Sequence, residues 1–192
     1  MTRARRLLLL FAATLATAAS SLLVSTPAHA SLDNTYACSV PAGYTYDAVS
    51  YGYNQCGSNG YKGTVYRLRL PADNLYACAK VPGYTEDQVS NGYNNCAPTA
   101  GTKAFVYRLR VPVDNLMACR PMSNLTYDQV SNGINQCSPE TGMKAFVYRI
   151  RFPQHGMLVC VVPPGWAQNG SSYGYNNCAP EIGMRSWIYT LA

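Results

Sequence analysis

The clearest chemical pattern in the sequence is a set of eight cysteines, all beyond residue 30. An even number of cysteines in an exported chain is typical of a disulfide framework. The cysteines recur as four pairs, one in each of four sequence repeats, and we expect each pair to form a disulfide because this closes four loops of equal length. The alternative pairs cysteines of neighbouring repeats. It uses spacings of 22 or 23 residues and leaves Cys38 to join Cys178. The expected bonds are Cys38–Cys56, Cys78–Cys96, Cys119–Cys137 and Cys160–Cys178, each with a separation of 18 residues.

Arginine pairs at positions i and i+2 form a second pattern, which recurs in the first three repeats. The pairs are Arg67/Arg69, Arg108/Arg110 and Arg149/Arg151, and a further cation, Lys62, Lys103, Lys144 or Arg185, precedes each expected strand. Guanidinium groups on one strand face could bind sulfated or carboxylated glycans, or an acidic protein surface. The alternative is a solvated face whose arginines stack on tyrosines or oppose edge-to-edge aggregation.

An aromatic or apolar residue followed by asparagine forms a third pattern, just before the second cysteine of each repeat. The pairs are Tyr53/Asn54, Tyr93/Asn94, Ile134/Asn135 and Tyr175/Asn176. A ring that stacks on a sugar, beside an amide that binds its hydroxyls, indicates a candidate carbohydrate site. Trp166, which replaces Tyr84 in the last repeat, is a further candidate, and Trp187 replaces Phe105 there. The alternative is that each amide binds local backbone and each ring packs in the core.

Catalysis is not indicated, because a catalytic pair must occur once in one geometry, whereas most polar residues here recur in every repeat. The one histidine beyond residue 30, His155, occupies the turn position held by Asp73 and Asp114. A metal site is not expected either, since no C-x-x-C pair occurs. We therefore expect no enzyme, no metal and no cofactor.

Residues 1–30 have the features of a signal peptide: three arginines, an apolar stretch and a small-residue cleavage site before Ser31. The alternative is an uncleaved membrane anchor, because about 18 weakly apolar residues could just span a bilayer. Cleavage would leave no further segment long enough to span a membrane. Cleavage would also lower the net charge from +6 to +3, with 12 basic and 9 acidic residues remaining. So small a charge argues against a nucleic-acid partner. We expect a secreted, extracellular protein, and its 48% hydrophobic and 12% charged residues exclude a disordered chain.

The cysteine pairs recur with periods of 40, 41 and 41 residues, which indicates four tandem repeats in one structural domain. The expected repeats are 31–71, 72–112, 113–153 and 154–192. The stretch 103–111, K-A-F-V-Y-R-L-R-V, alternates with period two and predicts a strand whose Phe105, Tyr107, Leu109 and Val111 face the core. A second strand is expected around each first cysteine.

Three finer features are expected of this mainly β fold. A capping pattern at Thr85 with Gln88, repeated at Thr126 with Gln129, predicts a short helix that a glycine such as Gly92 would end, and this glycine recurs in all four repeats. The alternative at Asn91-Gly92 is a hairpin turn. Turns such as P-A-D-N predict hairpins that join the last strand of one repeat to the first strand of the next. The unpaired first and last strands could then pair and close a pseudo-fourfold ring or barrel. The alternative is an open array of modules.

These patterns favour a secreted, non-enzymatic, multivalent, lectin-like protein that binds a glycan or another cell-surface polymer, because repetition raises avidity for repetitive targets. Two other hypotheses remain open. One is an inhibitor or toxin-like effector that acts on a secreted protein, and the other is a structural envelope or matrix protein.

Overall fold

A computed structural model describes residues 31–53, 55–57, 60–134, 136–140 and 142–192. The expected signal peptide, Asn54 and Asn135 lie outside the described residues. Leu32–Ala192 forms one compact unit. The described part of the chain contains no helix that could cross a membrane.

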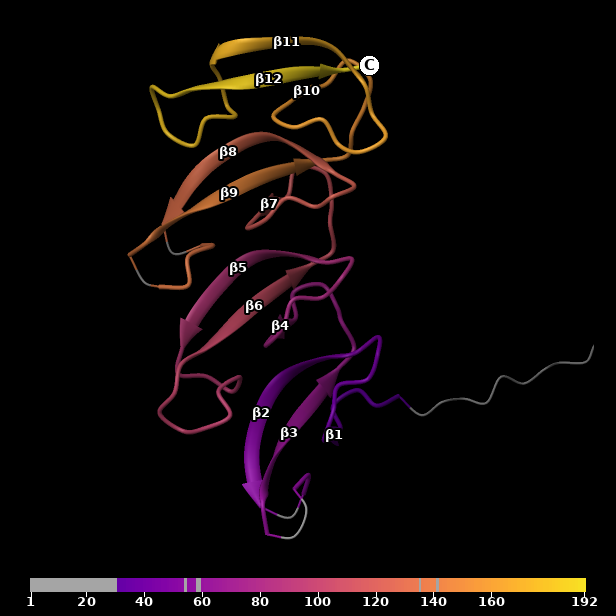
Figure 1. Ribbon diagram of the computed structural model, residues 1–192, viewed down its shortest axis with the longest axis vertical. Coiled ribbons are helices and arrows are strands. Elements are labelled where there is room, and N and C mark those ends of the chain that lie inside the picture. The colour runs from indigo at the N-terminus through magenta and orange to yellow at the C-terminus, as the bar shows by residue number, and fades with distance from the viewer. Residues whose placement is uncertain (1–30, 54, 58–59, 135, 141) are drawn as a thin grey trace, which may run out of the picture. The chain divides into compact units, whose positions relative to one another are not determined.

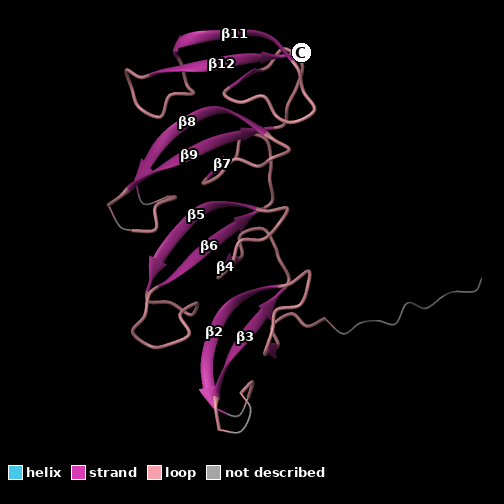
Figure 2. Cartoon of the chain, viewed as in Figure 1, coloured by secondary structure: helices cyan, strands magenta, loops and turns pink. Residues whose placement is uncertain are grey.

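In the described residues, twelve strands form four antiparallel sheets of three, and each sheet lies within one expected repeat (Figure 1 and Figure 2). The last strand of each repeat is the central one, with a two-residue strand on one side and a long strand on the other. The sheets comprise β1 (Tyr36–Ala37), β2 (Thr45–Tyr53) and β3 (Lys62–Arg69); β4 (Tyr76–Ala77), β5 (Thr85–Gly92) and β6 (Ala104–Arg110); β7 (Met117–Ala118), β8 (Thr126–Ile134) and β9 (Lys144–Arg151); and β10 (Leu158–Val159), β11 (Gln168–Tyr175) and β12 (Arg185–Leu191).

The predicted disulfides are confirmed in all four repeats. Each joins the residue that follows the short strand to the loop that follows the long strand, with Cα–Cα distances of 5.1 to 5.3 Å. The bonds are Cys38–Cys56, Cys78–Cys96, Cys119–Cys137 and Cys160–Cys178, and no described cysteine is free. Such a repeated framework suggests an oxidising, extracellular environment.

The predicted short helices are wrong, because the segments assigned to them form the long strands β2, β5, β8 and β11. Thr85 begins a strand and is fully buried, so it does not cap a helix. Gly92 lies at a strand end without a positive φ, so it is not a helix C′ residue. Pairing of each segment with the central strand of its repeat, such as β5 with β6, overrides the local capping pattern.

The predicted hairpins between repeats are also wrong. The short strand β4 pairs with β6 of its own repeat, with Tyr76 opposite Arg108 and Ala77 opposite Tyr107. The turn before β4 does have the expected left-handed residue, Asn74, at φ 63°. The turn brings the chain back to its own central strand, because Asn74 N–H donates to Leu109 O at 2.8 Å. The turns therefore connect repeats without pairing them.

Each sheet has buried apolar side chains, and in the third repeat Ala118, Leu125 and Ile150 form a core cluster. Leu68, Leu109, Ile150 and Leu191 are equivalent residues of the four central strands and are fully buried, as expected. Their neighbours on the same face are not all in the core, since Phe105 is 45% exposed and Val111 44%. In the second repeat, both ends of the predicted apolar face are therefore exposed, and Leu109 between them is core.

Successive repeats are joined by backbone hydrogen bonds at the outer edge of each long strand. Val49 N–H donates to Asn95 O at 2.7 Å, and Cys78 N–H donates to Tyr46 O at 2.8 Å. Equivalent bonds join the second repeat to the third, and the third to the fourth. A closed ring is not observed among the described residues: β12 pairs with β10 and β11, and β1 pairs with β3. The four sheets form an open series.

Candidate functional site

A β-bulge in each long strand places one side chain beside the arginine pair of the central strand. In β5 the register shifts between Glu86 and Gln88, so that Asp87 is the extra residue. The register shifts at the equivalent place in β2, β8 and β11. The bulged residue is Asp47, Asp87 or Asp128 in the first three repeats and Asn169 in the fourth.

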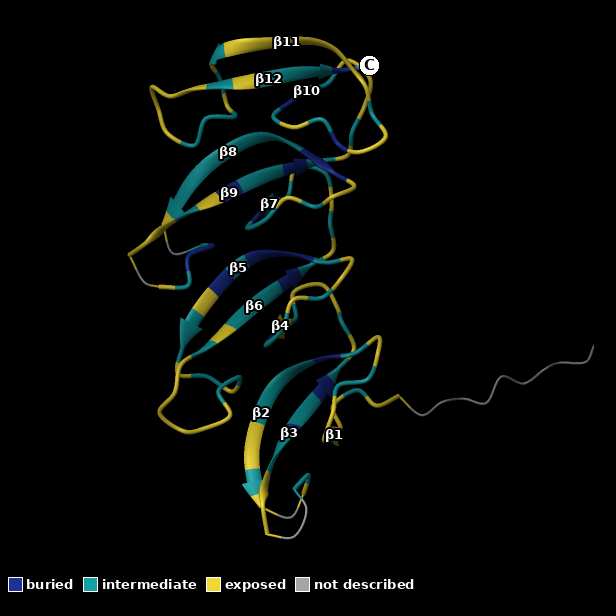
Figure 3. Ribbon diagram, viewed as in Figure 1, coloured by how far each residue is buried: buried dark blue, intermediate teal, exposed yellow. Residues whose placement is uncertain are grey.

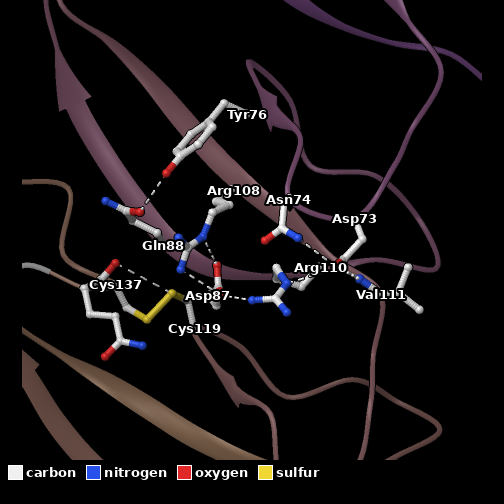
Figure 4. Close-up of polar contacts among 11 residues, drawn as sticks. Asp73, Asn74, Tyr76, Asp87, Gln88, Arg108, Arg110, Val111, Cys119 and Cys137 are labelled. Carbon is white, nitrogen blue, oxygen red and sulfur yellow. Dashed lines mark hydrogen bonds and ion pairs between the residues drawn. A yellow bond between two sulfur atoms is a disulfide. The ribbon is translucent and has the colours of Figure 1, made fainter.

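The bulge carboxylate binds both arginines of its repeat (Figure 4). Arg108 donates from Nε to Asp87 Oδ1 at 2.6 Å and from Nη2 to Oδ2 at 2.9 Å. Arg110 Nη1 donates to Asp87 Oδ2 at 2.6 Å. The side chain of Asp87 is 6% exposed, whereas those of the arginines are 32% and 24% exposed. The carboxylate is thus buried beneath its two cations, and its bonds raise the pKa of Arg108.

A second carboxylate completes each cluster from the turn before the short strand. Asp73 Oδ1 accepts from Arg110 Nε at 3.0 Å and from Val111 N–H at 2.9 Å. These two bonds, the backbone one first, lower the pKa of Asp73. Asp33 and Asp114 make the same pair of bonds in repeats one and three. Each cluster therefore ties the start of a repeat to the end of its central strand.

The six arginines proposed as an anion site all bind carboxylates of their own repeat. The fourth repeat has Asn169, Thr190 and Ala192 at the positions of Asp128, Arg149 and Arg151. The aspartate and both arginines are thus replaced together in this repeat, as expected if their main role is to bind one another. The geometry supports a structural role for the pairs.

The candidate amides bind backbone in the two repeats where they are described. Asn94 Nδ2 donates to Gly92 O at 2.8 Å and to Ala104 O at 2.7 Å, and Cys96 N–H donates to Asn94 Oδ1 at 2.8 Å. Asn176 makes the equivalent three bonds. Both amide hydrogens are therefore used to hold the loop that carries the disulfide, so the amides are poorly placed to bind a sugar.

The rings beside these amides lie in solvent. Tyr53, Tyr93 and Tyr175 are 61%, 74% and 69% exposed, and Ile134 at the equivalent position is 58% exposed. The next residues on this side of the sheet, Tyr51, Phe105, Phe146, Tyr173 and Trp187, are also about half exposed. They share a side because residues i and i+2 of a strand, and directly paired residues of antiparallel strands, point the same way.

We name this surface the aromatic face, and it includes one cation per repeat. Its residues are Tyr51, Tyr53, Lys62, Tyr93, Lys103, Phe105, Ile134, Lys144, Phe146, Tyr173, Tyr175, Arg185 and Trp187. The Nζ of Lys62 lies 4.9 Å from the ring centre of Tyr53, and that of Lys103 lies 5.9 Å from that of Tyr93. Arg185 lies 4.9 Å from the ring centre of Tyr175. The third repeat pairs Lys144 with Ile134 and has no such ring.

Trp166 lies apart from this surface. The centre of its ring lies 5.1 Å from that of His155, in the turn where His155-Gly156 replaces the Asp-Asn of the other repeats. Trp187 belongs to the aromatic face, where its ring contacts those of Tyr173 at 5.4 Å and Tyr189 at 6.5 Å. The two tryptophans therefore lie in different environments.

A shallow hollow of about 350 Å³ lies beside the first disulfide, lined by Tyr36, Ala37, Cys38, Ser50, Gln55, Cys56 and Val65. In later repeats the preceding long strand covers the equivalent region, so Ala77, Ala118 and Val159 are fully buried. Among the described residues, no long strand covers the equivalent region of the first repeat. No cluster of described residues could hold a metal ion.

Three kinds of contact were missed at the sequence level, among them the binding of each arginine pair by its bulge aspartate. The cation over each tyrosine could have been found, because Lys62, Lys103 and Arg185 recur at a fixed place relative to the strand. The ion pair of Arg120 with Glu86, at 2.8 Å between repeats two and three, had no repeated signal. Comparison of the chain with protein-family models, with curated proteins and with solved structures found no match.

Proposed function

We propose that this chain is a secreted, non-enzymatic protein that binds carbohydrate at several equivalent places, through its aromatic face. The observation that carries the proposal is the exposure of Tyr53, Tyr93 and Tyr175, each more than 60% exposed at the same place in three repeats. Scattered exposed rings need no explanation, but recurrent ones beside further exposed aromatic residues are typical of an interaction surface.

A carbohydrate fits such a surface better than a compact apolar ligand does. The surface is open, and the flat tyrosine rings offer an apolar platform with a polar hydroxyl at the edge. The amides of Asn94 and Asn176 bind backbone, so hydrogen bonds to the sugar come from the tyrosine hydroxyls and the neighbouring cations. One weak contact per repeat becomes useful on a polymer, because linked contacts raise the effective concentration.

The test is binding of residues 31–192 to immobilised neutral and acidic polysaccharides, measured by biolayer interferometry. The chain with Tyr53→Ser, Tyr93→Ser and Tyr175→Ser should bind at least about tenfold more weakly, since several linked contacts are lost. Tyr36→Ser is the matched control. This ring is 66% exposed but lies opposite Arg67, on the other side of the first sheet.

Retention of full affinity by the triple variant would contradict the aromatic face as the site. Absence of binding to every polysaccharide, with stoichiometric capture of one secreted protein instead, would favour the inhibitor hypothesis.

A further inference from the structure

We propose that the ligand of the aromatic face is an acidic polysaccharide, in which sugar rings stack on the tyrosines and carboxylate or sulfate groups bind the adjacent cations. This inference rests on the proposed function and names the chemical class of its ligand. It follows from where the charges of the described chain are neutralised and where they are not.

Seven of the twelve cations beyond residue 30 are neutralised within the fold. Arg67, Arg69, Arg108, Arg110, Arg120, Arg149 and Arg151 each form an ion pair with an aspartate or glutamate. These pairs use seven of the nine acidic residues: Asp33, Asp47, Asp73, Glu86, Asp87, Asp114 and Asp128. The arginine clusters therefore add little net charge to the surface.

The remaining five cations are Lys62, Lys80, Lys103, Lys144 and Arg185. No carboxylate of the described residues lies within 4.0 Å of them. Four of the five belong to the aromatic face, one in each repeat, and all four are exposed. Most of the cations that the ion pairs leave over are thus on the aromatic face.

The ring and the cation of one repeat are close enough to contact the same saccharide unit. Lys62 lies directly opposite Tyr53 in the strand register, and Arg185 lies opposite Tyr175. A neutral glycan would use the ring alone, whereas a uronate or sulfated unit would also neutralise the cation. Side chains of this length are flexible, so the cation can turn from the ring to the acid group at little cost.

The two acidic residues outside the ion pairs indicate which repeats bind most strongly. Glu140 lies four residues before Lys144, and Glu181 lies four residues before Arg185, where its Oε1 accepts from Asn132 at 3.2 Å. The loops of the first two repeats contain no such acid. Lys62 and Lys103 therefore lie in the more positive environment and should contribute most.

The test compares polygalacturonate with neutral dextran, and uses polyglutamate as a polyanion without sugar rings. We expect tighter binding to polygalacturonate than to the other two polymers, with a loss of about tenfold between 50 and 300 mM salt because exposed charges are screened. Lys62→Gln with Lys103→Gln should weaken polygalacturonate binding by about tenfold, since two exposed ion pairs with the polymer are lost. The charge-preserving control, Lys62→Arg with Lys103→Arg, should bind as the unchanged chain does.

Binding to dextran that neither salt nor the Lys→Gln changes alter would overturn this inference and leave the proposed function intact. Binding to no polysaccharide would overturn both. Equal binding of polyglutamate and polygalacturonate would overturn the inference, because charge alone would then explain the interaction.

Discussion

At the scale of single residues, the bulge aspartate determines much of the local structure. Asp87 binds two guanidinium groups and lies almost fully buried between β5 and β6. A β-bulge re-aims a side chain that a regular ladder would point elsewhere. The extra residue in the strand is therefore what allows one carboxylate to bind both Arg108 and Arg110.

Removing this carboxylate should destabilise the protein. We expect Asp87→Ala to lower the free energy of unfolding by about 2 kcal/mol, because two partly buried cations lose their shared partner. Urea denaturation followed by circular dichroism measures the change. The chain with Asp87→Asn, Arg108→Thr and Arg110→Ala, which copies the fourth repeat, should lose less. If the triple variant loses more free energy of unfolding than Asp87→Ala, the aspartate and the two arginines do not act as one unit.

The turn aspartates predict how stability depends on pH. Bonds to backbone N–H groups and arginines lower the pKa of Asp33 and Asp73, and bonds to Arg151 and Phe152 outweigh burial to lower that of Asp114. Because the folded pKa lies below the unfolded value, their contribution is complete above about pH 4 and is lost as the pH falls further.

Thermal melts at pH 7 and at pH 3 test this dependence. The melting temperature should fall at pH 3, and the fall should be smaller in the chain with Asp33→Asn, Asp73→Asn and Asp114→Asn. An equal fall in both chains would exclude these three carboxyl groups as its cause.

At the scale of the elements, the sequence predicts features that recur in every repeat, such as the disulfides. It does not decide between two local structures that fit the same segment, such as a helix and a strand. The constant spacing of 18 residues was sufficient for the disulfides, because equal loops leave one symmetric pairing. The segment after Thr85 fits both a capping pattern and a strand, and only pairing with β6 decides between them. Pairing of β4 with its own repeat could not be read from the turn, because Asn74 is left-handed in either topology.

Prediction of the candidate site was limited in the same way, because recurrence in the sequence does not show which contacts a side chain makes. Recurrence drew attention to Tyr93 and Asn94, but only coordinates separate the exposed ring from the backbone-bound amide. The arginine pairs had the alternating pattern of a surface strand. Their carboxylate partner, Asp87, lies 21 residues away from Arg108 in sequence, in a segment expected to be helical.

The boundary between repeats two and three predicts a compensated exchange. Glu86 is 1% exposed and binds Arg120, whereas the equivalent positions hold Tyr46 with Ala79 and Tyr127 with Val161. We expect Arg120→Ala to cost about 3 kcal/mol, because it leaves a buried carboxylate without its cation.

The double variant Glu86→Tyr with Arg120→Ala recreates the first boundary and should recover most of that loss in urea denaturation. If the double variant is as unstable as Arg120→Ala alone, the unpaired carboxylate of Glu86 is not the cause of the lost stability.

At the scale of the whole molecule, the series of sheets is open at its C-terminal end. The strand β11 is exposed along nearly its whole length, whereas β5 is largely buried (Figure 3). Its sequence is polar, with Ser171 where the earlier repeats have Val49, Val89 and Val130. Terminal repeats with a polar outer side are typical of repeat proteins that remain soluble.

Amide hydrogen exchange should report this open end. Val130 N–H donates to Asn177 O of the next repeat, whereas Ser171, at the same register opposite Tyr189, has no such partner in another repeat among the described residues. We expect Ser171 N–H to exchange about a hundredfold faster than Val130 N–H. The adjacent Ser172 N–H, which points toward β12, is the internal control and should be protected. Slow exchange at Ser171 would instead indicate a closed ring or an assembly that covers β11.

The aromatic face as the carbohydrate site can be tested most directly at Trp187, which is one of only two tryptophans in the chain and is 52% exposed. Trp166→Phe leaves Trp187 as the single fluorophore, and Trp187→Phe leaves Trp166 beside His155 as the control. Acrylamide quenching is then measured with and without polygalacturonate. The account predicts that the polymer protects Trp187 and leaves Trp166 unchanged, whereas protection of Trp166 alone, or of neither ring while the polymer is bound, would contradict it.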